Sequence, residues 1–115
     1  MLELTLPYPP SANRYWRHFQ GRTVVSQEAK DYRDEVAWLM LAKGAQPYAG
    51  PIRVTLRVYR PRKARDLDNC LKVTLDAMQG GAYLSDAQIV ELHALRYEDK
   101  HRPRIEVKIE EAGQR

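Results

Sequence analysis

The segment from Ile52 to Tyr59 alternates strictly between aliphatic side chains and basic, hydroxyl or aromatic ones, in the order Ile-Arg-Val-Thr-Leu-Arg-Val-Tyr. Successive side chains of a β-strand point to opposite faces of its sheet. The pattern therefore predicts a strand with one face in a core and a basic face outside it. Because the apolar face of such a sheet must be covered, the chain has to supply other elements around this strand.

Two segments carry apolar residues at helical spacing and are the natural cover for this sheet. The first follows Ser26, a residue typical of helix N-caps, has Glu28 in its first turn, and ends near Lys43 and Gly44. The second is closed by two consecutive glycines. Their apolar positions are Ala29, Tyr32, Val36, Leu39 and Met40 in the first, and Leu67, Leu71, Leu75 and Met78 in the second.

Three more alternating segments predict three more strands, at Leu2–Leu6, Val90–Ala94 and Ile105–Ile109. Residues 8–22 are rich in Pro, Asn, Arg and aromatics without periodicity, which predicts an ordered loop. A chain of 115 residues is large enough to close one core. We therefore expect residues 1–115 to form a single compact domain of the α/β (mixed α+β) class, with about four strands in a mixed sheet and two main helices.

The charge of the chain favours polyanionic partners, since the net charge is +4 and the pI is about 9.3. No apolar run approaches the roughly 18 residues that span a bilayer, and the single Cys70 cannot form an internal disulfide. These features favour a cytoplasmic protein without a membrane partner. The basic residues are concentrated in one stretch without an acid, at Arg53, Arg57, Arg60, Arg62, Lys63 and Arg65.

The motif Arg65-Asp66-Leu67-Asp68-Asn69 places two carboxylates two residues apart where the second helix is expected to start. Mg²⁺ prefers oxygen ligands and is typically held by one or two carboxylates together with phosphate oxygens. Asp86, in the loop after that helix, could complete such a set. The structural alternative is that Asp66 caps the helix and Asp68 complements its dipole.

Lys72 follows Asp68 by four residues and so lies on the same side of the predicted helix. It either contacts a phosphate or pairs on the surface with Asp68 and Asp76. The basic stretch before the motif favours the first role, because a site that cleaves phosphodiesters must hold DNA against its own acidic ligands. Arg62, Lys63 and Arg65 are the candidate DNA-binding residues of that stretch.

Basic and aromatic residues interleave in the loop from Pro9 to Phe19, with Arg22 close behind. Such a mixture suits a nucleic-acid backbone with exposed bases, which a branch point offers and an intact duplex does not. The alternative is a loop that packs on the core and carries a few surface arginines. The candidate DNA-binding residues here are Asn13, Arg14, Tyr15, Arg17 and Arg22.

Other chemistries find less support in the sequence. His18, His93 and His101 are scattered without a zinc-like spacing, and a helix cysteine such as Cys70 is usually inert packing. No glycine-rich loop follows a strand, so no nucleotide cofactor is expected. A rival nuclease pattern, Asp86 followed by Glu106-Val107-Lys108, is discounted because any amphipathic strand with alternating charges yields it.

Taken together and in this order, several motifs resemble those of the RusA-family Holliday junction resolvases, and the resemblance runs from the first strand to the last. The fold class it implies is the same mixed single domain. The motifs are Leu6-Pro7-Tyr8-Pro9-Pro10-Ser11-Ala12-Asn13-Arg14-Tyr15, Gly21-Arg22 with Ser26, Tyr32-Arg33, Arg65-Asp66-Leu67-Asp68-Asn69 with Lys72, and Asp86-Ala87-Gln88-Ile89-Val90.

The resemblance implies a homodimer, commonly encoded by phages or prophages, that binds four-way DNA junctions and makes paired symmetric nicks with Mg²⁺, Mn²⁺ being the alternative ion. It implies that Asp66, Asp68 and Asp86 bind the metal and that Lys72 assists at the scissile phosphate. One departure is Ser85-Asp86, where many relatives carry two adjacent acids.

Two other functions stay open at this point. A protein of the same fold could grip branched DNA without cutting it, or a small accessory protein could use its charges only for solubility. The presence of all three aspartates together with Lys72 favours the enzyme.

Overall fold

The computed structural model describes residues 1–10, 16–19, 21–62 and 67–113, with the backbone alone at 16–19, 22–25 and 67–69. The predicted helices and strands are present, and a short hairpin and a 3₁₀ helix are added to them. In chain order the elements are β1 (Leu2–Pro7), β2 (Trp16–Phe19), β3 (Arg22–Val25), α2 (Gln27–Ala42), β4 (Ile52–Arg60), α3 (Leu67–Met78), η1 (Asp86–Gln88), β5 (Ile89–Glu98) and β6 (Arg104–Glu111).

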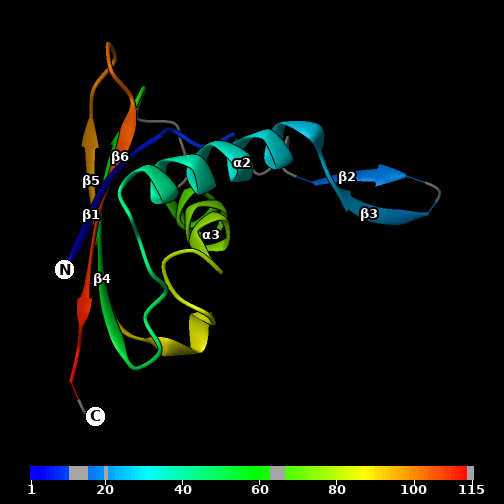
Figure 1. Cartoon of the computed structure of the whole chain (residues 1–115). Coiled ribbons are helices and arrows are strands. Elements are labelled where there is room, and N and C mark those ends of the chain that lie inside the picture. Colours follow the sequence, from blue (N-terminus) through cyan, green and yellow to red (C-terminus); the bar gives the residue numbers. More distant parts are fainter. Residues whose placement is uncertain (11–15, 20, 63–66, 114–115) are drawn as a thin grey trace.

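Four strands form one mixed sheet in the order β1-β6-β4-β5. β6 is antiparallel to both β1 and β4, whereas β5 runs parallel to β4. Both helices lie on the same face of this sheet, and the opposite face is left open (Figure 1). The predicted class, a mixed sheet with two main helices in one compact unit, is confirmed.

The core lies between the sheet and the helices. The aliphatic side chains of β4 are fully buried. The buried aliphatic side chains of the neighbouring strand β6, and of β1 beyond it, extend the same layer. α2 contributes Ala29, Tyr32, Val36 and Met40, four of its five predicted apolar positions, and the fifth packs partly against the core. Truncating a fully buried aliphatic such as Leu56 typically costs about 2–5 kcal/mol, so this layer sets the stability of the domain.

The ends of α2 are where the sequence places them. The Ser26 hydroxyl accepts a hydrogen bond from the backbone N–H of Ala29 at 3.2 Å, as an N-cap does. At the other end, the backbone N–H of Lys43 donates to the Leu39 carbonyl at 3.2 Å, and Gly44 has a φ of 70°. Glycine adopts this left-handed conformation without steric cost, which is why the helix stops there.

The buried face of α3 differs from the predicted stripe of leucines. Leu71 and Leu75 are only half-buried. α3 packs against both the sheet and α2, so its buried face is wider than a single row of leucines. Small side chains fit this face because the neighbouring elements are closely packed. The buried residues on the described side chains of α3 are Cys70, Val73, Thr74, Ala77 and Met78.

The prediction of a loop through residues 8–22 was wrong in part, because β2 and β3 form an antiparallel hairpin there. Phe19 pairs with Arg22, so the connection is a two-residue turn, and Gly21 has the positive φ of 74° that such turns favour. The aromatic and β-branched residues on either side of Gly21 suit strands, although they do not alternate in polarity. The hairpin precedes α2 and projects away from the sheet (Figure 1). None of the helices in the described part of the chain is long and apolar enough to cross a membrane.

Candidate active site

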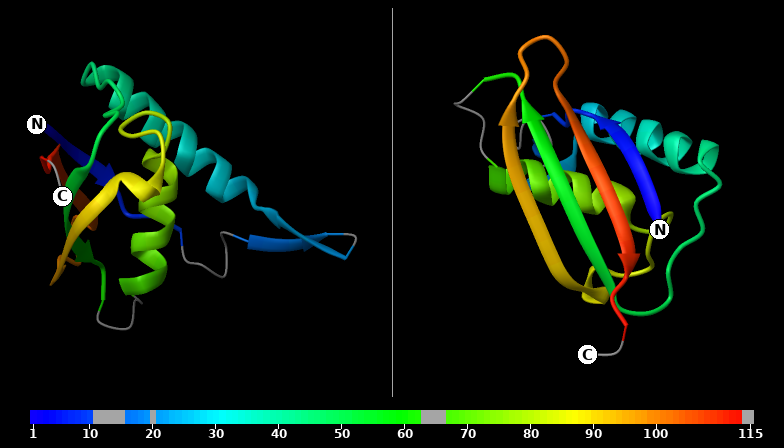
Figure 2. Two further views of the ribbon diagram at one scale, coloured as in Figure 1. Left: turned by 90° about the horizontal axis from the view of Figure 1, so that it is seen from below. Right: turned by 90° about the vertical axis from the view of Figure 1, so that its left-hand side faces the viewer.

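Three segments meet at one end of the sheet, which we call the loop end. β1 finishes there with Pro7 opposite Arg104, and β4 finishes there with Arg60 opposite Glu98. The turn between β5 and β6, residues 99–103, closes the same end, and the backbone N–H of Asp99 donates to the Arg60 carbonyl at 2.9 Å. The right-hand view of Figure 2 shows these strand ends and the turn at the same end of the sheet. The two segments predicted to bind DNA therefore start at the same end of the sheet, with β6 between them, although they are some 50 residues apart in sequence.

Of the predicted DNA-binding residues, Arg62 is the one whose side chain the structure describes, and it is exposed. Asn13, Arg14, Tyr15, Lys63 and Arg65 lie outside the described residues. Arg17 and Arg22 are placed by backbone only, Arg17 opposite Val24 and Arg22 opposite Phe19 in the β2–β3 hairpin. The path into the first of these segments is fixed by Tyr32 of α2, whose hydroxyl donates to the Pro7 carbonyl at 2.8 Å. Burial raises the pKa of this hydroxyl, so it remains a donor.

The basic face of β4 carries less free charge than the sequence indicates. Arg53 forms ion pairs with Glu91 of β5 and with Glu110 of β6, the latter at 3.5 Å. Arg60, at the end of β4 and on its opposite face, pairs with Glu98 at 3.6 Å. The sheet thus brings acids from neighbouring strands onto arginines that have no acid near them in sequence. Arg57 is exposed in the middle of the open face and has no ion-pair partner among the described side chains.

α3 begins directly after the basic segment, and its first turn holds Asp68, placed by backbone only, while Asp66 lies outside the described residues. Lys72 is exposed one turn further on and forms no ion pair with a described side chain. The predicted alternative partner, Asp76, is instead held by Arg33 of α2. Lys72 is therefore available to a ligand that approaches the exposed side of α3.

Asp86 opens η1, and its side chain is exposed. It lies at the opposite end of the sheet from the loop end, because β5 starts beside the start of β4, with Ile89 opposite Ile52. In both views of Figure 2, η1 is nearer to the end of α3 than to its start. Consistently, the pKa of the Tyr83 hydroxyl, which donates to the Leu75 carbonyl, is raised by burial and then by Asp86 and Asp76. One chain alone thus holds Asp86 apart from the first turn of α3.

Residues 7–110 match the family model of endodeoxyribonuclease RusA. The chain belongs to the RusA family. The crossover junction endodeoxyribonuclease of Enterobacteria phage 82 is 40% identical over 96% of this chain and 94% of its own length. The proteins of the same name from Escherichia coli K12 and Shigella sonnei are 41% and 39% identical over the same shares of each chain. The resemblance inferred from the sequence motifs is confirmed.

Within this RusA fold, Gln88 holds η1 in place. The sequence analysis included Gln88 in a motif but assigned it no role. Its side-chain amide donates to the carbonyls of Tyr48 and Gly50 at 2.7 and 2.9 Å. Its oxygen accepts from the backbone N–H groups of Leu84 and Ser85 at 2.8 and 2.9 Å. Four hydrogen bonds thus hold the turn that presents the carboxylate two residues earlier. The spacing Ser-x-x-Gln, typical of a capping box, was the available signal.

Ser85 has a structural role in this member of the RusA family. Its hydroxyl accepts a hydrogen bond from the backbone N–H of Ala87 at 3.2 Å and caps η1. Serine and aspartate are both good caps, so the serine can take over this role from an acid. Asp86 is left as the outward carboxylate of the loop.

The rival nuclease pattern is built into surface ion pairs on the open face of the sheet. Glu106 accepts from Arg104 at 3.3 Å, and Lys108, which is exposed, lies 3.9 Å from Glu110. His93 lies on the same face beside Glu91, and His101 lies in the turn at the loop end. Within the part of the chain that the structure describes, no three Asp, Glu, His or Cys side chains converge as a metal site would require.

Proposed function

We propose that this protein is a Mg²⁺-dependent endodeoxyribonuclease that acts as a homodimer on four-way DNA junctions and makes paired, symmetric nicks. The observation that carries the proposal is the strand register, which starts both basic segments at the loop end, where the acidic motif of α3 also follows. Cations that hold a DNA backbone then lie beside carboxylates that suit a hard metal ion. The names of the relatives agree with this substrate.

Asp66, Asp68 and Asp86 are the proposed metal ligands. Carboxylate oxygens are the donors that Mg²⁺ prefers, and Asp86 offers an exposed carboxylate on a turn that hydrogen bonds hold in place, so the residues fit the ion; Mn²⁺ accepts the same donors. When bound, the ion polarises a phosphoryl oxygen and lowers the pKa of its water. Lys72, exposed on α3, contacts the scissile phosphate and stabilises the charge that develops on it.

The cationic and aromatic residues at the loop end bind the substrate in this proposal. Arginine and lysine neutralise phosphates without reading sequence, and aromatic rings stack on bases that a branch point leaves exposed. These residues are Asn13, Arg14, Tyr15, Arg17, Arg22, Arg62, Lys63 and Arg65.

Because Asp86 lies apart from the start of α3, we propose that the homodimer completes the metal site. A two-fold axis can bring Asp86 of one protomer toward Asp66 and Asp68 of its partner, and the same operation builds a second, identical site. Two identical sites match the two related strands of a four-way junction. Each site would then need both protomers, which couples cutting to assembly.

The test is cleavage of a labelled synthetic four-way junction and a matched linear duplex, with and without Mg²⁺. We expect paired nicks in the junction alone, dependent on the metal. Asp68→Asn should fold, dimerise and bind the junction without cutting it, and Lys72→Ala should cut it roughly 100-fold more slowly. Wild-type rates in Asp68→Asn would remove the proposed site, and tight binding without any nick by the wild type would leave a DNA-binding module.

A further inference from the structure

We infer that the turn between β5 and β6 is a further DNA contact, in which Lys100, His101 and Arg102 face the phosphates of a duplex arm. The inference deepens the proposed function, since it rests on DNA being the substrate. None of these three residues belongs to the segments predicted to bind DNA from the sequence.

The acids beside this turn are paired with arginines of the protein itself. Glu98 pairs with Arg60, and the carboxylate of Asp99 accepts a hydrogen bond from the Arg104 guanidinium at 2.8 Å. The pKa of Asp99 is lowered by the backbone N–H of Arg102 and then by Arg104, so the carboxylate stays ionised. Both negative charges are therefore matched by structural arginines and do not cancel the outer cations.

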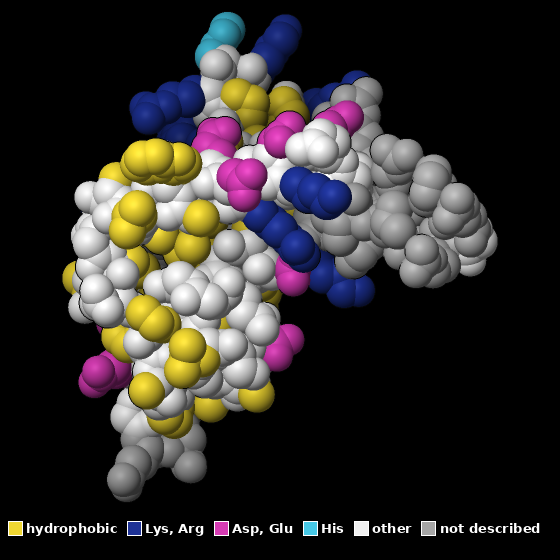
Figure 3. Space-filling model, turned by 45° about the vertical axis from the view of Figure 1, so that its right-hand side comes forward, with side chains coloured by type: hydrophobic (Ala, Val, Ile, Leu, Met, Phe, Trp, Pro, Cys, Tyr) yellow, Lys and Arg dark blue, Asp and Glu magenta, His cyan; other side chains and the backbone are white. Residues whose placement is uncertain are grey.

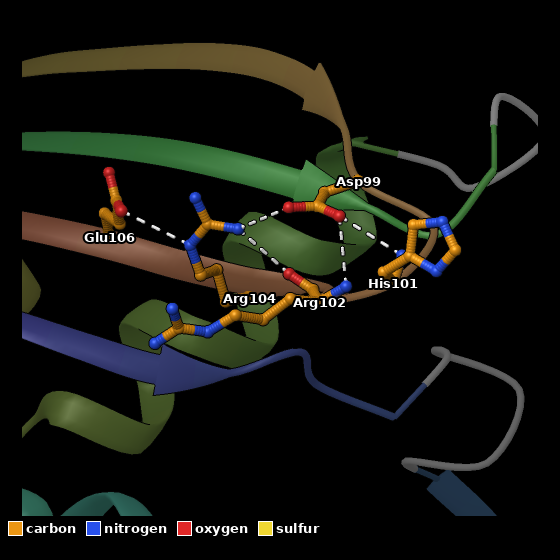
Figure 4. Close-up of polar contacts among 5 residues, drawn as sticks. All are labelled: Asp99, His101, Arg102, Arg104 and Glu106. Carbon is orange, nitrogen blue, oxygen red and sulfur yellow. Dashed lines mark hydrogen bonds and ion pairs between the residues drawn. The ribbon is translucent and has the colours of Figure 1, made fainter.

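The turn is also built to keep one shape. The second oxygen of Asp99 accepts from the backbone N–H groups of His101 and Arg102 at 3.1 and 3.0 Å (Figure 4). The Arg104 guanidinium donates to the Arg102 carbonyl at 3.0 Å and lies 3.8 Å from the ring centroid of Tyr59. Because the turn is ordered in advance, little conformational entropy is lost when a ligand binds it.

The remaining polar side chains of the turn are exposed to solvent. Lys100, His101 and Arg102 are exposed, and among the described residues their side chains have no ion-pair partner. Figure 3 shows basic and histidine side chains gathered at this tip of the molecule. Lysine and arginine without an acidic partner form strong hydrogen bonds with phosphate oxygens. Histidine adds a further hydrogen-bond donor.

The position of the turn connects it to the proposed DNA-binding segments. Asp99 donates its backbone N–H to the carbonyl of Arg60, and Arg62 follows two residues later with its side chain exposed. The turn and the start of the basic segment therefore leave the sheet side by side. A duplex arm that lies across the loop end can contact both, whereas a contact along the open face meets mainly paired charges.

The test compares the salt dependence of junction binding for the wild type and Lys100→Ala/Arg102→Ala. Each lost phosphate contact makes the negative slope of log K against log salt less steep by about 0.9. For the double variant we therefore expect a slope that is less steep by about 1.8. Affinity at 0.1 M salt should fall roughly tenfold, equally for junctions of different arm sequence. The rate of a single turnover at saturating protein should stay that of the wild type.

The matched control is Lys43→Ala/Lys108→Ala, which removes the same charge from exposed sites away from the loop end. It should keep the wild-type slope, and Lys100→Arg/Arg102→Lys should restore it. If the turn variant keeps the slope of this control, the inference is overturned while junction cutting still stands. If the wild type binds junctions with the expected slope but never cuts, the cleavage proposal fails and the turn contact survives.

Discussion

The two ends of the sheet are built by different means and present different chemistry. The loop end is held by arginines paired with acids, and it presents cations outward. The opposite end is held by the four hydrogen bonds of Gln88, and it presents the carboxylate of Asp86. A nuclease needs both, cations to hold the backbone and carboxylates to hold a metal. One chain therefore separates Asp86 from the acidic motif that follows the loop end, and the proposed metal site has to bring these carboxylates together.

The strongest test of this separation uses mixed dimers of Asp68→Asn and Asp86→Asn. Each variant alone should lose roughly 10³-fold in cutting rate, because a metal ligand is gone. If a site takes Asp86 from one protomer and Asp68 from its partner, a mixed dimer contains one intact site and one doubly altered site. Mixing should then restore nicking of one strand, measured on a junction labelled in both.

The reference for this experiment is a mixture of Asp68→Asn with Asp66→Asn. Both substitutions fall on the same motif, so no arrangement of two such chains leaves one site intact, and the mixture should stay inactive. If the Asp68→Asn and Asp86→Asn mixture also stays inactive while exchange of subunits is verified, the shared site is ruled out.

A second change weakens only the end that carries Asp86. Gln88→Leu removes four hydrogen bonds and leaves two carbonyls and two backbone N–H groups to find water. We expect a loss of about 2–3 kcal/mol in the free energy of unfolding, and about a tenfold loss of cutting rate with junction affinity unchanged. Denaturant unfolding and single-turnover cleavage measure the two effects.

Gln79→Leu makes the same replacement at an exposed position beside the end of α3 and should stay within about 0.5 kcal/mol of the wild type. A Gln88→Leu protein with normal stability and normal cutting would show that the hydrogen bonds of this turn do not position Asp86.

The smallest effect is expected at the loop end, from Asp99→Asn. The pKa of Asp99 is lowered in the folded protein, so its ionised form adds stability above the ordinary aspartate pKa, and this stability is lost as the pH falls through the lowered value. The variant should therefore melt at a lower temperature than the wild type at pH 7, and the gap should close below about pH 4.

Asp34→Asn, an exposed acid of α2 without a described ion-pair partner, provides the comparison. Its melting temperature should follow that of the wild type across the same pH range. A constant gap for Asp99→Asn from pH 7 to pH 3 would mean that the carboxylate charge does not hold the turn.

The sequence predicted most of the fold because its signals were local. The alternation of β4 and the cap at Ser26 depend on a few adjacent residues, and both were confirmed. The hairpin β2–β3 was missed because its strands are four residues each and do not alternate in polarity. The buried face of α3 was also predicted incompletely. This helix packs against two partners, and a single stripe of apolar residues at helical spacing does not indicate a face of that width.

The candidate site was harder to predict for a different reason. The motifs that carry the resemblance are contiguous, so the family could be recognised and Asp66, Asp68, Asp86 and Lys72 proposed. Their distances depend on strand register, which pairs residues far apart in the chain. No local pattern indicated that Arg53 is matched by Glu91, or that Asp86 lies at the other end of the sheet from Arg62.

The parallel pairing of β4 and β5 has a consequence for the proposed metal site. Two parallel strands start at the same end of a sheet. The connection between them must therefore run back along the length of the sheet, from the end of the first strand to the start of the second. That crossover opens with the acidic motif and closes with Asp86. The length of this crossover therefore sets the distance between the two groups of carboxylates. Many surface residues of such a fold can change, but a change in the length of α3 would alter the spacing of the proposed metal ligands.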